Sequence, residues 1–112
     1  MTAADRTDAL VRGLVAGDDR AIGELRALSA TSEDVTVLVA TALVGPGWPA
    51  LLDRAAAAAA DLRGRQLVAI ARAHLTGDDD RARLLARDHL AEHPETLLVA
   101  HIAAGATTGR TP

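Results

Sequence analysis

Four histidines are the residues of this 112-residue chain best suited to chemistry, and all lie in its last third: His74, His89, His93 and His101. Imidazole titrates near neutral pH and is a common metal ligand. On a helix, His89 and His93 are four residues apart and share a face, a spacing that can chelate a divalent metal. A third ligand would come from His74 or His101 on neighbouring helices. One hypothesis is therefore a metal- or ligand-binding helical protein, with hydrolysis among the activities open to it.

The same histidines also have a structural interpretation, which we favour. His93 precedes Pro94 at a predicted helix end, where a cationic or donor side chain suits the last carbonyls. His74 stands in an otherwise apolar column, so we expect it to be partly buried and hydrogen-bonded. The chain has no cysteine and no lysine, which removes most other nucleophiles. We predict no catalysis, no metal and no cofactor.

Two other motifs have simpler explanations than a ligand site. The acidic clusters at 18–19 and 78–80 are too short for a calcium loop and are suited to cap the helices that follow. The segment 45–49, GPGWP, lacks the lysine and the spacing of a phosphate-binding loop. We interpret it as a rigid loop between helices, with Trp48 packed on its neighbours or, alternatively, anchoring a contact.

Charge and hydropathy exclude two classes of partner. All 12 basic residues are arginines, dispersed among 15 acidic ones, and the net charge is −3, which argues against nucleic-acid binding. The longest uncharged stretch, 35–52, is broken by Gly and Pro, so we expect no membrane span and a cytoplasmic protein. Arg12 and Arg72 stand five residues before equivalent glycines; they either line a groove for an acidic peptide or are solvated surface residues.

Regularly spaced glycines reveal an internal repeat. Gly17, Gly45, Gly77 and Gly105 are separated by 28, 32 and 28 residues. The nine residues before them read DALVRGLVA, TVLVATALV, VAIARAHLT and TLLVAHIAA. The residues seven, six, three and two positions before each glycine are apolar, except for His74, and form one stripe on a helix. Each glycine is predicted to end its helix with a positive φ.

A second helix is predicted after each of the first three glycines. These helices span 19–29, 49–63 and 79–93, with Pro49 in a first turn and Pro94 closing the last. The chain is then all-α, with seven helices in antiparallel pairs and the last one single. We expect one domain over residues 1–106 and a frayed tail over 107–112.

The third unit resembles the tetratricopeptide repeat, a 34-residue helix–turn–helix unit. With Gly77 at the turn glycine, Ala82 takes the small second-helix position, Leu90 a late hydrophobic position and Pro94 the terminal proline. No unit has the early Trp or the Tyr of that family. The resemblance implies a right-handed α-solenoid of about three and a half repeats that serves as a protein-interaction scaffold without catalysis of its own.

The seventh helix is apolar on more than one face, and no second helix follows to cover it. We therefore expect this end to pack on another chain, most simply as a two-fold homodimer. The predicted function is a non-catalytic protein-interaction or assembly module of the tetratricopeptide type, with a protein or peptide partner. The candidate partner-binding residues are Arg12, Arg72, Leu97, Leu98, His101 and Ile102.

Overall fold

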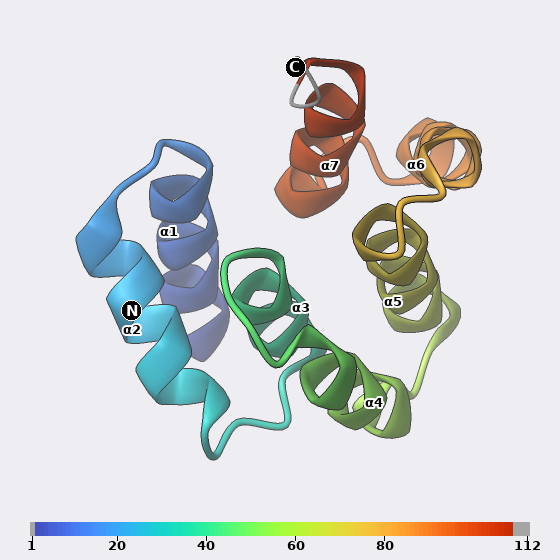
Figure 1. The fold of residues 1–112 in the computed structure, drawn as a ribbon. Helices are drawn as coiled ribbons and strands as arrows, with labels where there is room; N and C mark the ends of the chain where they lie inside the picture. Colours follow the sequence, from blue (N-terminus) through green and yellow to red (C-terminus); the bar gives the residue numbers. More distant parts are fainter. Residues whose placement is uncertain (1, 109–112) are drawn as a thin grey trace.

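Seven α-helices follow one another along residues 2–108, the part of the chain that the computed structural model describes (Figure 1). This part contains no strand, and none of its helices combines the length and the apolarity needed to cross a bilayer. The all-α class and the seven helices are thus confirmed. Of the predicted tail, 107 and 108 belong to the last helix, and 109–112 lie outside the described residues. The helices are α1 (Ala3–Val15), α2 (Asp19–Ser29), α3 (Val35–Leu43), α4 (Trp48–Ala58), α5 (Leu62–Leu75), α6 (Asp79–Glu92) and α7 (Leu97–Thr108).

Acidic side chains begin the helices that the sequence assigned to them. Asp18 accepts a hydrogen bond from the backbone N–H of Arg20 at the start of α2, and Asp78 accepts one from Arg81 at the start of α6. These caps satisfy donors that have no partner inside the helix. The two acidic clusters are therefore capping elements, as predicted.

Only two of the four glycines end helices in the predicted way. Gly17 after α1 has φ 81° and Gly77 after α5 has φ 86°, both left-handed. In the loop after α3, the left-handed residue is instead Gly47, at φ 80°, which is also the N-cap of α4. The prediction for Gly45 is therefore wrong. The prediction for Gly105 is also wrong, because this glycine lies inside α7. Its neighbours in the sequence are alanines, and a helix tolerates one glycine at a cost of about 1 kcal/mol.

The predicted end of α4 at Arg63 is also wrong. The helix stops at Ala58, and Ala59 leaves it with an extended ψ of 109°. Asp61 then begins α5 by accepting a hydrogen bond from the backbone N–H of Gly64 at 2.7 Å. A side chain that caps the next helix outweighs the helix propensity of the alanine run.

The predicted apolar columns form the core. The residues seven and six positions before each glycine are all buried, in α1, α3, α5 and α7 alike. Trp48 is partly buried and packs against this core. Helices approach closely: a Cβ atom placed on Gly13 would lie 2.5 Å from the Cβ of Ala21, so α1 and α2 cross with almost no side chain between them.

The helix pairs form a closed array in which the last helix touches the first. Each pair contacts the next, and α7 lies beside α6 and α5 (Figure 1). A contact smaller than that with α6 joins α7 to α1. The extents of 34 × 32 × 26 Å and the radius of gyration of 12.9 Å match a globular chain of this length, for which about 13 Å is usual. The apolar face of α7 is therefore covered within its own chain, contrary to the expectation that nothing in this chain would cover it.

Two glycine variants test how the turns shape this fold. We expect Gly77→Ala to lower the free energy of unfolding by about 1–2 kcal/mol, because alanine is strained at positive φ although space is available. Gly23→Ala, in the interior of α2 and also unobstructed, is the matched control and is expected to raise it by up to about 1 kcal/mol. Urea unfolding measures both. Equal effects of the two variants would show that Gly77 is not conformationally required.

Candidate functional site

His89 is the centre of a buried polar network between α5, α6 and α7. Only 2% of its surface is exposed. Its Nδ1 lies 2.7 Å from Oε1 of Gln66, and its Nε2 lies 3.1 Å from Oγ1 of Thr96. Because the amide oxygen of Gln66 accepts, Nδ1 carries the proton, and Nε2 accepts from the hydroxyl of Thr96. Both ring nitrogens are therefore engaged within the protein.

Charged side chains extend this network to the surface. Arg63 donates to Oγ1 of Thr96 at 3.2 Å and lies 3.6 Å from the carboxylate of Glu95. His93, the residue at the end of α6, lies 3.7 Å from the same carboxylate, and its ring is 5.0 Å from that of His89. The network joins α5 to the turn between α6 and α7, so it holds these three helices in their relative positions.

The environment of His89 lowers its pKa below the ordinary value of 6.5. Burial is the main cause, and the charges of His93 and Arg63 act in the same direction, while Glu95 and Glu92 oppose them. The imidazole is thus neutral at neutral pH, as its two hydrogen bonds require.

The structure does not bring the four histidines together as one set of metal ligands. Within residues 2–108, no three His, Asp or Glu side chains gather so that they could hold a metal ion. His89 and His93 are neighbours, but the nitrogens of His89 are already used. His74 is partly buried on α5, as predicted, and His101 is exposed on α7. The metal hypothesis therefore has no ligand set in this arrangement.

The larger of two grooves lies where α1, α3, α5 and α7 begin, and we call it the end groove. It has a volume of about 870 Å³, and His89 and Thr96 belong to its wall. Arg12 is part of its lining. Four of the charged side chains around it are acidic and two are arginines, so the groove carries a net negative charge. These side chains are Asp8, Arg12, Asp34, Asp61, Arg63 and Glu95.

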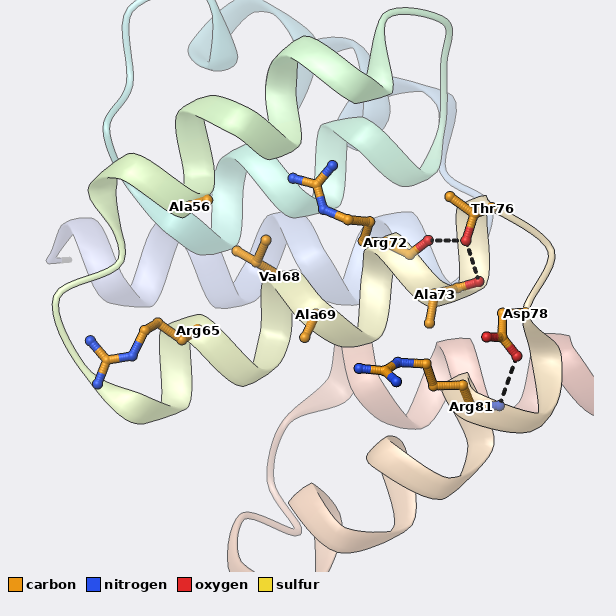
Figure 2. Close-up of a pocket in the computed structure, with 9 residues that line it drawn as sticks. All are labelled: Ala56, Arg65, Val68, Ala69, Arg72, Ala73, Thr76, Asp78 and Arg81. Atoms are coloured by element: carbon orange, nitrogen blue, oxygen red, sulfur yellow. Dashed lines mark hydrogen bonds between the residues drawn. The ribbon is translucent and has the colours of Figure 1, made fainter.

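A second groove runs along the outer side of α5, between α4 and α6 (Figure 2). We call it the arginine groove; its volume is about 600 Å³. Its five α5 residues stand at positions i, i+3, i+4, i+7 and i+8, which places them on one face of that helix. Three arginines and one aspartate stand among small residues. The lining is Ala56 of α4, Arg65, Val68, Ala69, Arg72 and Ala73 of α5, Thr76 and Asp78 of the turn, and Arg81 of α6.

The arginine groove carries an excess of positive charge. Arg72 pairs with Asp53 of α4 at 3.2 Å, but Arg65 and Arg81 form no ion pair with any residue between 2 and 108. The carboxylate of Asp78 is used as the cap of α6. Two guanidinium groups are thus available to an anionic ligand.

Arg12 and Arg72, for which a shared groove was one of two interpretations of the sequence, line different grooves. Arg72 lies in the arginine groove and Arg12 in the end groove, because Arg12 is on α1, at the other side of the array. Sequence reasoning missed Arg65 and Arg81. The spacing of seven residues between Arg65 and Arg72 is a signal that they share a helix face.

The remaining partner-binding candidates lie on α7. Leu98 and Ile102 are 2% and 1% exposed, because their own chain covers them, so neither offers surface to a partner in this arrangement. Leu97, 39% exposed, and His101 are accessible. A homodimer through α7 stays a prediction, with a smaller apolar surface to support it.

The stability of the protein should fall as the pH is lowered from about 7.5 to about 5.5. In this range the unfolded chain takes up a proton on His89 more readily than the folded chain, so protonation favours unfolding. The contribution of His89 to stability is therefore complete above the pKa that this histidine has in the unfolded chain, and it decreases at lower pH. Urea unfolding at several pH values measures this, and His89→Gln should reduce the slope. The exposed control His101→Gln should leave it unchanged; equal slopes for the native protein and His89→Gln would contradict the assignment.

The comparisons with known proteins add no support to the resemblance to the tetratricopeptide repeat, which depends on residues of this chain alone. No protein-family model, no curated protein and no solved structure matches this chain. The residues that carry the resemblance lie in the pair α5 and α6: Gly77 has the left-handed turn conformation, Ala82 is buried and Pro94 follows the end of α6.

Proposed function

We propose that this protein is a non-catalytic binding module that takes a segment of a partner protein in the arginine groove. The observation that carries the proposal is a groove with small residues along its floor and two arginines that lack an ion pair within the described chain. Small side chains let a partner backbone come close, and free guanidinium groups can pair with it.

The openness of the groove favours a polypeptide over a small molecule. Arg65, Ala69, Thr76 and Arg81 are all exposed along it. A small ligand needs to bury most of its surface, which such an open site does not allow. A chain segment can instead lie along the groove and contact α4, α5 and α6 together.

The helix pairs support a relation to the tetratricopeptide type. We propose that α1 to α6 are three repeats of this kind and that α7 is the half repeat. In an open array the first helices of the repeats line a concave surface. Here α7 meets α1, so we place the binding surface on the outer side.

The histidine network supports the non-catalytic part of the proposal. A general base needs a free nitrogen within reach of a substrate proton. The nitrogens of His89 are held by Gln66 and Thr96, and the residue is buried. The hydrogen bonds of His89 connect α6 to α5 and to the residue before α7, which is a structural role.

Filling the groove tests this function. Ala69→Tyr places a large side chain on the groove floor at an exposed position, whereas Ala91→Tyr makes the same change on an exposed part of α6 outside both grooves. We expect the free energies of unfolding of the two variants to differ by no more than about 0.5 kcal/mol. Affinity capture from the native cells, with quantitative mass spectrometry, should recover proteins with the native chain and Ala91→Tyr that are lost with Ala69→Tyr. The same set captured by all three would contradict the proposal.

A further inference from the structure

We infer that the occupant of the arginine groove is an acidic α-helix of the partner, with two carboxylates seven residues apart and small residues between them. This inference rests on the proposed function and adds the chemistry of the partner. It is carried by a comparison of two equivalent helices, by the spacing of the arginines and by their charge.

The chain covers the outer face of α3 but leaves the same face of α5 open. Val37 and Ala40 of α3 stand eight and five residues before Gly45, and both are buried. The residues eight and five before Gly77 are Ala69, which is exposed, and Arg72, which is partly exposed.

The equivalent residues of α1 (Ala9 and Arg12) and of α7 (Leu97 and Ala100) are exposed as well, so α3 is the one helix of the four that closes this face. What distinguishes α5 is that its open face is also the floor of a groove between α4 and α6.

The arginines around α3 are also occupied. Arg26 of α2 donates to the carbonyl of Val44 at 2.6 Å, and Arg54 of α4 donates to the carbonyl of Ser32 at 3.0 Å. Arg65 and Arg81 make no such bond with the described residues. Space and unused donors thus coincide at α5.

The shape of the groove suits a helix. It is bounded by α4 and α6, and its floor is the face of α5 that carries Ala69 and Ala73 (Figure 2). Helices pack with axes about 8–10 Å apart, and the shorter distances require small residues at the contact. The wall formed by α4 contributes only the methyl group of Ala56.

The spacing of the charges sets the pattern on the partner. Arg65 and Arg72 are two helical turns apart, about 10 Å along the axis of α5. Carboxylates at positions i and i+7 of a helix lying along α5 have the same separation. Arg72 already pairs with Asp53, but Asp53 is largely exposed and Arg72 partly so, and an ion pair in contact with water is readily exchanged. Arg81 on the opposite wall can assist either carboxylate.

This spacing argues against two other occupants. A single phosphate is bound by converging donors, whereas Arg65 and Arg72 are separated along the helix. A second copy of this chain does not offer the pattern either: none of the described helices carries two carboxylates seven residues apart.

Synthetic helical peptides test the inference on the full-length protein. The probe is a labelled alanine-based peptide of about 20 residues with two glutamates seven apart. One control has glutamine at both positions, a second has the glutamates five apart on different faces, and a third carries a single phosphoserine. Fluorescence anisotropy should show that the probe binds about tenfold more tightly than each control.

Protein variants locate the site. Arg65→Gln/Arg81→Gln should abolish the preference for the probe. The matched control Arg20→Gln/Arg87→Gln removes two exposed arginines outside both grooves and should retain it. Circular dichroism and urea unfolding establish that both double variants remain folded.

The outcomes separate this inference from the proposed function. If the glutamine peptide binds as tightly as the probe, and Ala69→Tyr abolishes both, the groove binds helices but the acidic pattern is overturned. Equal binding of the two glutamate spacings, or tighter binding of the phosphoserine peptide, overturns it as well. Absence of peptide binding also overturns the acidic-helix inference. The proposed function would still be upheld if the native chain and Ala91→Tyr capture proteins that Ala69→Tyr does not.

Discussion

Helix packing through thin side chains is the constraint on which the rest of this structure depends. Trp48 is the only aromatic residue, so Leu, Val, Ile and Ala fill the core, and helix axes lie close together. The contact of Gly13 with Ala21 is the extreme case. Helices that approach this closely allow an array of three pairs to curve until α7 reaches α1. The binding surface that we propose lies on the outside of this array, between α4 and α6.

Much of this fold could be predicted from the sequence because it depends on local signals. Periodic apolar columns indicate the helices, and acidic caps indicate where they start. Each of these signals involves only residues that are a few positions apart in the sequence. The errors arose where two signals compete. Asp61 ends the alanine run early because it caps α5, and the loop after α3 offers two glycines, of which Gly47 takes the left-handed conformation.

The candidate site was less predictable, because it depends on which elements become neighbours. Arg12 and Arg72 occupy equivalent columns, yet repeat symmetry does not place them in one groove when the array closes. His89 looked like a metal ligand from its spacing to His93. Its partner Gln66 is 23 residues away on α5, and no pattern in the sequence joins them.

The contact between α1 and α7 also has a consequence for how the protein unfolds. In an open repeat array each unit touches only its neighbours, so the ends can open separately from the middle. Here the two ends cover each other, and the contact joins residues about as far apart in sequence as the described chain allows. Opening either terminal helix exposes the apolar face of the other, so the repeats lose their independence and unfold as one cooperative unit.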